Sequence, residues 1–248
     1  MNQTELIVGI HPVREAILGG RSIEKVLLER GAQNGRLFEI LKLCRQKKIP
    51  VSLLPPVKLM YIAGERSQGA AAKLSVHEYV TVESMLATAA KAEEQPLLLI
   101  PEGVEDPQNL GALVRTALCA GVHGVIIPDS GAVGLTWGTS KASAGAVEYM
   151  PVCRASNMPG TLTSLKENHI RLVGFEANQG AKLWDTDLTG PMAVVLGGEH
   201  KGIRPHVKRH LDLVVQIPMK GAIGSLNVSA AGAVVLYEIA RQRTQKKK

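Results

Sequence analysis

The stretch QIPMKGAIGSLNVSAAGAVVLYE, residues 216–238, decides the fold of the second part of this chain. The apolar run that leads into it, LVVQI at 213–217, predicts a buried strand, and Pro218 ends this strand because proline cannot donate to a central sheet ladder. A glycine-containing loop follows, and after it apolar residues recur at the spacing of one helix face. Ser225 and Asn227 therefore stand at a helix start, where backbone N–H groups and short polar side chains form either a ligand site or an ordinary helix cap.

Two further stretches have the same organisation. AVVLGGEHKGIRP at 193–205 runs from an apolar strand into two adjacent glycines, a glutamate and a third glycine. PEGVEDPQNLGALVRTALCAGVHGVIIP at 101–128 runs from a strand end through a polar loop into a helix that carries Asn109 and Arg115, and then into another strand. Because ligands of open α/β sheets lie beyond the carboxyl ends of the strands, we expect the three loops to meet at one edge of a sheet.

The chain as a whole predicts two α/β domains. Strand and helix patterns alternate along residues 96–248, which predicts a parallel sheet flanked by helices on both faces. Residues 1–76 alternate in the same way and predict a smaller α/β domain with its own core. The segment between them, 77–95, is rich in Ala, Thr and Ser and carries one Lys against four Glu, so we interpret it as a linker with some strand or helix content.

Basic residues concentrate in the first domain. Residues 1–76 contain 12 Lys and Arg against 6 Asp and Glu, while the whole chain has a formal net charge of +7. This excess fits a polyanionic partner, and the aromatic content of 3% leaves few rings on which bases could stack. We therefore expect RNA binding through phosphate contacts, with a solvated basic face as the alternative.

Other classes of site and location have no signal in this sequence. The three cysteines lie far apart without zinc spacing, and no HExxH, Walker or dinucleotide-binding motif occurs, so we expect no metal. No secretory leader and no apolar run of about 18 residues is present, so we expect a cytoplasmic protein outside the membrane.

Together the three loop stretches resemble the three ordered motifs of the SpoU (TrmH-type) family of ribose methyltransferases. The likeness is greatest to its RlmB-type branch, which 2′-O-methylates a guanosine of 23S ribosomal RNA. This resemblance implies a SPOUT fold, in which residues 193–238 form a deep trefoil knot. It also implies a homodimer, S-adenosylmethionine as cofactor, and an N-terminal RNA-binding domain of the L30e type. The segments GIHPVREAI at 9–17 and SQGAAAK at 67–73 look like hallmarks of that domain.

The resemblance also assigns roles to individual residues. The residues implied to bind the cofactor end the strands or occupy the loops of the second and third motifs: Gly197, Ile217 and Leu226, with Gly198 and Met219 nearby. Glu176 and Ala177, which end the strand before the second motif, are weaker candidates. The side chains of Ile217 and Leu226 could instead be ordinary core residues. The residues implied in catalysis are Arg115, Asn109, Glu199, Ser225 and Asn227.

Arg115 is the residue on which we expect the reaction to depend most. A ribose 2′-hydroxyl is a poor nucleophile, so the site must align it and stabilise the negative charge that develops on its oxygen. A guanidinium does not lose its proton in proteins, so we expect electrostatic stabilisation and a phosphate clamp rather than general-base catalysis. A surface ion pair is the alternative for Arg115.

The motifs depart from the family pattern at one position, and they leave the substrate open. His200 stands where the family more often has glycine, and it would be either a solvent-facing replacement or a titratable group beside the site. A transfer RNA is the alternative substrate, because sister families share the motifs. A non-catalytic RNA-binding or ribosome-assembly protein is the alternative of another class, although the intact motif residues argue against it.

Overall fold

The structure is a computed structural model, and it describes residues 6–31, 35–47, 49–74, 78–198, 202–222 and 224–246. The chain divides into two compact units, the first formed by residues 1–78 with 135–137 and the second by residues 79–134 with 138–248. Each unit has its own sheet.

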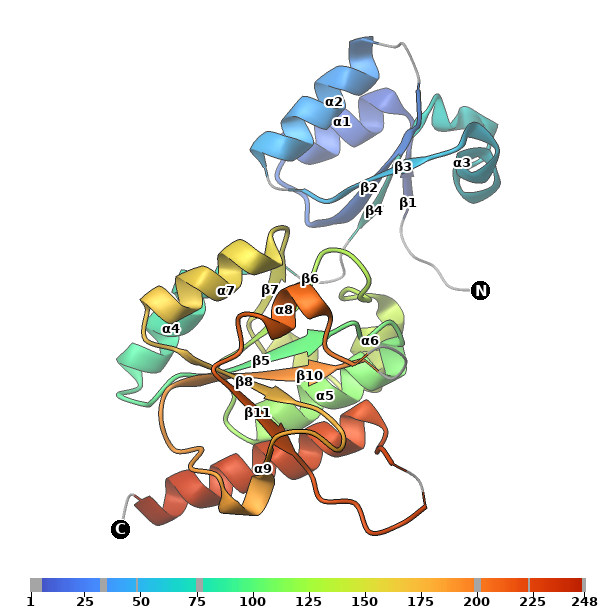
Figure 1. Ribbon diagram of the computed structural model, residues 1–248. Coiled ribbons are helices and arrows are strands. Elements are labelled where there is room, and N and C mark those ends of the chain that lie inside the picture. Colours follow the sequence, from blue (N-terminus) through green and yellow to red (C-terminus); the bar gives the residue numbers. More distant parts are fainter. Residues whose placement is uncertain are drawn as a thin grey trace. The chain divides into compact units, whose positions relative to one another are not determined.

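The first unit is built on a four-stranded mixed sheet (Figure 1). Its elements are β1 (Leu6–Val8), α1 (Ile10–Leu18), β2 (Ile23–Glu29), α2 (Gly35–Gln46), β3 (Val51–Leu54), α3 (Pro56–Ala63), the 3-10 turn η1 (Glu65–Ser67) and β4 (Ala70–Leu74). The strand order is β1-β4-β2-β3, with β2 and β3 parallel and the other pairs antiparallel.

Two clusters of apolar side chains hold the first unit together. Helices α1 and α2 cover one face of the sheet, where Val13, Ile40 and Cys44 are fully buried. Burial raises the pKa of the Cys44 thiol to about 11, so this thiol stays protonated near neutral pH. Helix α3 covers part of the other face through Leu59, which packs with Leu27 from β2. The first domain therefore has a core of its own.

The second unit is built on a seven-stranded sheet in which all neighbouring strands are parallel. Its strands are β5 (Leu97–Glu102), β6 (Gly124–Pro128), β7 (Val152–Ala155), β8 (Arg171–Phe175), β9 (Ala181–Lys182), β10 (Met192–Gly197) and β11 (Leu213–Gln216). Its helices are α4 (Val82–Lys91), α5 (Pro107–Cys119), α6 (Trp137–Ala142), α7 (Met158–Glu167), α8 (Pro205–Lys208) and α9 (Val228–Lys246), with 3-10 turns η2 (Ala146–Glu148) and η3 (Leu183–Asp185). The strand order is β7-β6-β5-β10-β8-β11-β9.

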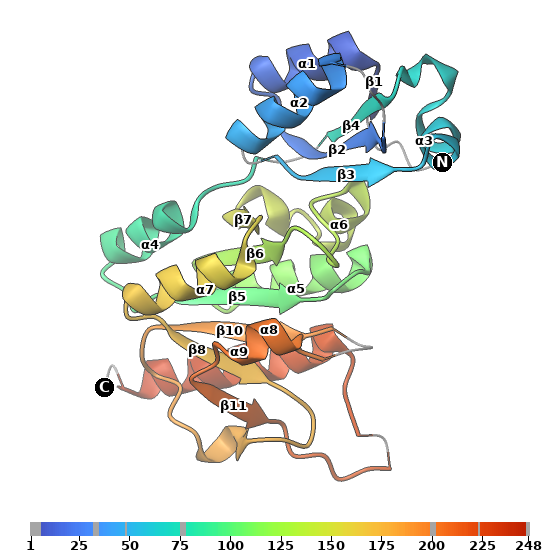
Figure 2. The same cartoon turned by 45° about the horizontal axis from the view of Figure 1, so that its top comes forward.

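Helices cover both faces of this sheet, as Figures 1 and 2 show. Alternate side chains of a strand point to opposite faces, so Leu98 and Ile100 of β5 pack with α4, α7 and α8 in one cluster. On the other face α5 packs against α9. Gly232 permits this contact, because a Cβ on it would lie 2.4 Å from Leu113 of α5 and 3.0 Å from Leu196 of β10. The parallel sheet flanked by helices, predicted from the alternating pattern, is confirmed.

Residues 79–95, within the segment interpreted as a linker with some strand or helix content, group with the second unit and contain helix α4. Helix α4 buries Met85 completely, and the sulfur of Met85 lies 2.3 Å from the position that a Cβ on Gly124 would occupy. The N–H of Val80 donates to the carbonyl of Val152 at 2.8 Å, which joins the chain to the edge strand β7. The division between the units falls after Glu78, inside the 77–95 segment, and the domain bounds drawn from the sequence stay a prediction. The trefoil knot and the L30e likeness stay predictions.

Candidate active site

A cavity of about 730 Å³ lies where β8, β10 and β11 end. Its volume falls within the range of about 300–1,000 Å³ that small-molecule sites commonly have. The described residues that line it are Phe175, Glu176, Ala177, Gln179, Leu196, Gly197, Gly198, Gly202, Ile203, Pro205, Lys208, Ile217, Met219, Ser225, Leu226, Asn227, Val228 and Ala231. The carboxyl edge of the parallel sheet is therefore the edge that carries the cavity, as the loop positions predicted.

The glycines of the second motif make close backbone contacts at this edge. The N–H of Gly202 donates to the carbonyl of Gly198 at 3.1 Å, so the loop folds back on itself. A Cβ on Gly197 would lie 2.5 Å from the carbonyl carbon of Gly202, and a Cβ on Gly198 would lie 2.2 Å from the carbonyl oxygen of Gly103. Gly202 has φ +59°, a backbone conformation that residues other than glycine rarely adopt. At Gly197 and Gly198 a side chain is excluded because other backbone segments occupy the space.

Asn227 joins the starts of two helices beside the cavity. Its Oδ1 accepts from the N–H of Ser229 at 2.9 Å and from the N–H of Ala230 at 3.3 Å, which caps α9. Its Nδ2 donates to Oδ1 of Asn109 at 3.0 Å, and Asn109 lies in the first turn of α5. Asn227 therefore fits both interpretations made from the sequence, because its side chain caps α9 and the residue also lines the cavity.

Sequence reasoning missed the residue that fixes the start of α5. The carboxylate of Asp106 accepts from the N–H of Gln108 at 3.2 Å and from the N–H of Asn109 at 3.3 Å. Asp at the N-cap followed by Pro107 at the first helical position is a recognised signal for a helix start, so the pair Asp-Pro could have identified it. By holding the first turn of α5, Asp106 sets the position of Asn109.

The structure brings most of the expected site residues together. All seven candidates for cofactor contact line the cavity, namely Gly197, Gly198, Ile217, Met219, Leu226, Glu176 and Ala177. Ser225 and Asn227 line it too, and Asn109 is bonded to Asn227. Glu199 and His200 lie outside the described residues.

Arg115 is the described site candidate that neither lines the cavity nor bonds to a residue that lines it. It is exposed on α5, it is not among the lining residues, and it makes no hydrogen bond or ion pair with the described residues. Six residues along a helix correspond to about 9 Å of rise and to about 120° between side-chain directions, so Arg115 and Asn109 point away from each other. Within one copy of the chain, Arg115 therefore does not converge with the site residues that the structure describes.

Two ion pairs lie next to the cavity, and sequence reasoning identified neither. Glu102, fully buried at the end of β5, pairs with Arg204, which also donates to the carbonyl of Ser130 at 3.1 Å. Lys208 pairs with Glu176 at 2.5 Å. Both pairs join the segment after the second motif to a neighbouring strand end, which holds that segment against the sheet.

A third contact fixes β11 against β8. Burial raises the pKa of the Asp212 carboxyl, but the N–H of Leu172 at 2.8 Å and the ammonium of Lys166 at 2.6 Å outweigh this and hold the pKa below its usual range. A carboxyl whose pKa is lowered by folding contributes stability above its unfolded pKa, and this contribution is lost as the pH falls through the folded value. The contact therefore supports the sheet at neutral pH.

The part of the chain that the structure describes contains neither a candidate metal site nor a candidate membrane span. No group of three or more His, Cys, Asp and Glu side chains could hold a metal ion there. Likewise, no helix formed by the described residues is long and apolar enough to cross a membrane.

Both units of the chain match models of known protein families. Residues 96–237 match the model of the SpoU rRNA methylase family, and residues 6–80 match the model for RNA 2′-O ribose methyltransferase substrate binding. A Staphylococcus saprophyticus protein named for the TrmH family of tRNA/rRNA methyltransferases is 38% identical over 238 residues, which are 96% of each chain. A Staphylococcus aureus protein of the same name is 39% identical over 238 residues, again 96% of each chain.

Solved structures share the fold. The SpoU methyltransferase AviRb from Streptomyces viridochromogenes, solved with the cofactor AdoMet, matches with a TM-score of 0.60 and 24% identity over 97% of this chain and 90% of that chain. A structure described as an RNA 2′-O ribose methyltransferase matches with a TM-score of 0.56 and 28% identity over 96% of this chain and 88% of that chain.

Proposed function

The chain belongs to the SpoU family of RNA methyltransferases, also named TrmH, and on this premise we propose that it transfers a methyl group from S-adenosylmethionine to a ribose 2′-oxygen of ribosomal RNA. We propose a guanosine of 23S ribosomal RNA as the target and the cytoplasm as the place of action. The observation that carries the proposal is the convergence of nine expected residues on one cavity, namely Gly197, Gly198, Ile217, Met219, Leu226, Glu176, Ala177, Ser225 and Asn227.

The cavity fits the cofactor in size and in chemistry. Its volume of about 730 Å³ leaves room for a nucleoside carrying an amino-acid chain. Ile217, Met219 and Leu226 offer apolar surface for a base, while the glycine loop offers backbone groups without side chains in the way. When bound, S-adenosylmethionine supplies an activated methyl group. The protein therefore needs to align the ribose and to stabilise charge rather than to activate the methyl group.

The polar residues at the start of α5 and α9 are suited to hold the ribose. Asn109 and Asn227 are joined at 3.0 Å, so their amide groups lie together at the starts of the two helices. Ser225 lines the cavity beside them and adds a hydroxyl. Arg115 is the group that would stabilise the alkoxide and clamp a neighbouring phosphate, since its guanidinium carries a fixed positive charge and a planar set of donors.

The exposure of Arg115 on α5 supports a homodimer in which two copies complete each other's sites. A second copy packed on the exposed faces of α5 and α9 would bring its own Arg115 toward this cavity, and closed two-fold pairing makes both sites equivalent. Tyr237, 54% exposed on α9, offers apolar area for such a contact.

We expect light scattering after gel filtration to give twice the 26.5 kDa mass of one chain. Tyr237→Glu should shift the mass toward one chain, because a buried carboxylate without a partner opposes association. The same change at Tyr61, 91% exposed in the first unit, is the control and should leave the dimer intact. A fully active monomer at micromolar concentration would contradict the dimer.

The substrate is tested by methyl transfer to purified RNA. We expect label from methyl-labelled S-adenosylmethionine to enter 23S ribosomal RNA, and nucleoside mass spectrometry to identify 2′-O-methylguanosine. Label in transfer RNA alone would favour the alternative substrate, which the relatives' shared name leaves open. No transfer to either RNA would favour the non-catalytic alternative.

The first unit is expected to carry RNA affinity rather than catalysis. A chain starting at Tyr79 keeps α4 and the whole second unit, so it should fold and bind S-adenosylmethionine like the full chain. Its RNA affinity should fall by about tenfold or more, with a shallower salt dependence, because the number of counterions released follows the number of phosphates that the protein neutralises. Titrations of RNA at several salt concentrations measure both quantities.

A chain starting at Pro96 is the matched control for this truncation. It lacks α4, which leaves the space filled by Met85 empty, so it should unfold at lower temperature than the chain starting at Tyr79. Unchanged RNA affinity in the chain starting at Tyr79 would show that the first unit serves something other than RNA.

A further inference from the structure

Glu176 is a carboxylate at the cavity wall whose two oxygens have different surroundings. It follows β8 directly, and its N–H donates to the carbonyl of Val215 at 3.1 Å, which fixes its backbone to β11. Oε2 accepts from the ammonium of Lys208 at 2.5 Å. Oε1 accepts no hydrogen bond from the described residues and lies 3.6 Å from where a Cβ on Gly202 would stand. The free oxygen thus lies beside a glycine that also lines the cavity.

Lys208 is held in turn by two acceptors. Besides Glu176 it donates to Oε1 of Gln179 at 3.0 Å, and all three residues line the cavity. The Glu176 side chain is only 13% exposed while that of Lys208 is 39% exposed, so the carboxylate is the more buried partner of this ion pair. Among the described lining residues, Glu176 is the only acid and Lys208 the only base. The pair is therefore a defined polar feature in a wall that is otherwise glycine, apolar or neutral.

We propose that Glu176 accepts hydrogen bonds from the ribose hydroxyls of the bound cofactor and that Lys208 is the positioning residue that aims its carboxylate. This inference rests on the cofactor assignment of the proposed function. A carboxylate at the carboxyl end of a parallel strand is the group that binds ribose hydroxyls in dinucleotide sites, and hydrogen bonds to an ionised acceptor are about twice as strong as neutral ones.

The ion pair favours the ribose over the other end of the cofactor. The amino-acid end carries an ammonium group, and Glu176 already has the ammonium of Lys208 on one oxygen. Since the negative charge is compensated there, a second cation gains little from it, while a neutral diol still gains hydrogen bonds at the free oxygen. Glu176 thereby makes the cavity select ribonucleosides over deoxyribonucleosides.

Calorimetry with cofactor fragments tests this on the full-length protein. The probes are S-adenosylhomocysteine, 5′-methylthioadenosine, which lacks the amino-acid end, and 2′,3′-dideoxy-5′-methylthioadenosine, which lacks the hydroxyls. The dideoxy compound should bind the unaltered protein about 10- to 100-fold more weakly than 5′-methylthioadenosine, as expected for hydrogen bonds to a charged acceptor. This comparison requires no variant.

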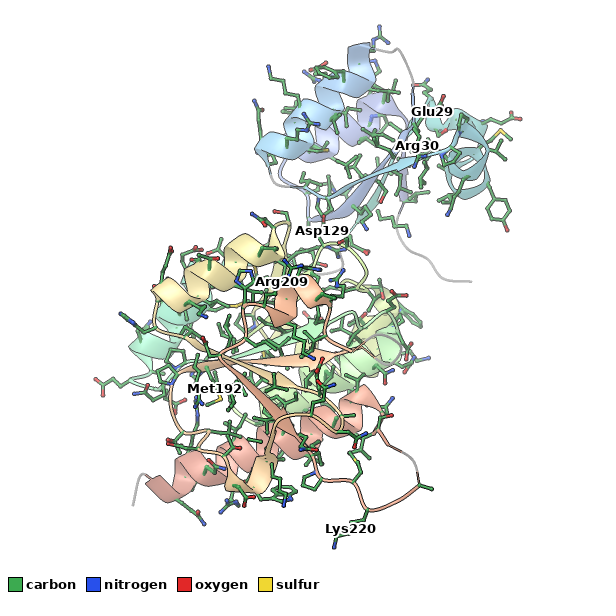
Figure 3. All side chains as sticks on the ribbon, viewed as in Figure 1. Glu29, Arg30, Asp129, Met192, Arg209 and Lys220 are labelled. Carbon is green, nitrogen blue, oxygen red and sulfur yellow. The ribbon has the colours of Figure 1, made fainter. Side chains whose placement is uncertain are left out.

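Glu176→Gln should weaken S-adenosylhomocysteine and 5′-methylthioadenosine by the same factor, about tenfold, and should shrink the penalty for the dideoxy compound to below about threefold. Lys208→Met should also shrink this penalty while leaving the dideoxy compound's own affinity unchanged, and Lys208→Arg should restore part of it. A merely structural lysine would weaken all three ligands alike. The control variants are Glu167→Gln, on α7, and Arg209→Met. Arg209 directly follows α8 and is labelled in Figure 3.

Three outcomes would overturn the inference. An equal dideoxy penalty in Glu176→Gln and in the unaltered protein would show that the carboxylate does not meet the ribose. A loss for S-adenosylhomocysteine with none for 5′-methylthioadenosine would place Glu176 at the amino-acid end. If the unaltered protein binds none of the adenosine ligands, the cofactor assignment itself fails, and this inference fails with it.

Discussion

Arg115→Lys is expected to slow methyl transfer by about 10²- to 10³-fold, a loss like that of a missing oxyanion donor. Lysine keeps the positive charge but loses the planar fork that can contact a phosphate oxygen and the ribose oxygen together. Because that contact is strongest once negative charge has developed, the loss should appear in the chemical step. S-Adenosylmethionine affinity should stay within about twofold, since Arg115 does not line the cavity.

Single-turnover rates with saturating RNA and cofactor, together with calorimetry, separate these two quantities. Arg171→Lys is a matched control, because Arg171 is an exposed arginine of the same unit that starts β8 and lies away from the cavity lining. A near-normal rate for Arg115→Lys would exclude the assigned role. A loss of cofactor affinity in proportion to the rate would make Arg115 a structural residue instead.

Mixing two inactive variants shows whether Arg115 acts across the dimer. Arg115→Ala removes the guanidinium, and Ile217→Trp fills the cavity in a second chain that keeps Arg115. If the site of one copy uses Arg115 of the other, random exchange of subunits should restore about a quarter of the wild-type sites, since half of the dimers are mixed and each has one complete site. If Arg115 acts within its own chain, mixing restores nothing.

The position of Arg115 illustrates what a motif predicts and what it leaves open. The pattern of Asn109 and Arg115 on one helix identifies both residues, because residue type and spacing are local information. Whether each of them faces the cavity depends on helix geometry, and six residues of helix turn the two side chains about 120° apart. The glycines and apolar residues that line the cavity were therefore predictable from the motifs, whereas the absence of Arg115 from its lining was not.

The glycine loops and the buried strands were predictable for a related reason. Apolar runs such as that of β10 signal a strand covered on both faces, and adjacent glycines at its end signal backbone crowding. The backbone that crowds this strand end belongs to Gly103, which follows β5. Gly103 lies far away in sequence, so only the structure identifies it. Lys208 was missed in the same way, because its pairing with Glu176 joins two segments that the sequence does not connect.

Strand β4 and helix α3 are two elements that the sequence patterns did not predict. Strand β4 begins with Ala70, Ala71 and Ala72, and alanine is depleted in strands, yet β4 lies between β1 and β2 with these alanines fully buried. Tertiary context decides there, since small side chains suit a strand packed closely on both faces. Helix α3 starts after Pro55 and buries only Leu59, so its sequence lacks the apolar stripe by which helices are recognised.

Gly198→Ala is expected to destabilise the second unit by about 3 kcal/mol or more and to weaken S-adenosylmethionine binding by at least about tenfold. A Cβ on Gly198 would lie 2.2 Å from the carbonyl oxygen and 2.7 Å from the carbonyl carbon of Gly103. Both atoms are backbone, so no side chain can rotate away, and one of the two loops has to move. Overpacking in a rigid core costs typically about 1–3 kcal/mol, and a contact this short between two backbones belongs at the upper end or beyond it.

Gly190→Ala is the matched control for this prediction. Gly190 has no atom within 4 Å of its added Cβ and no positive φ, so alanine there should change stability by less than about 0.5 kcal/mol. Thermal unfolding should place the midpoint of Gly198→Ala about 6–12 °C below that of Gly190→Ala, given about 2–4 °C per kcal/mol for a domain of this size. Because the loop that must move also lines the cavity, the cofactor should bind more weakly even to the folded variant. Equal midpoints and equal affinities for the two variants would mean that the second-motif loop does not lie against Gly103.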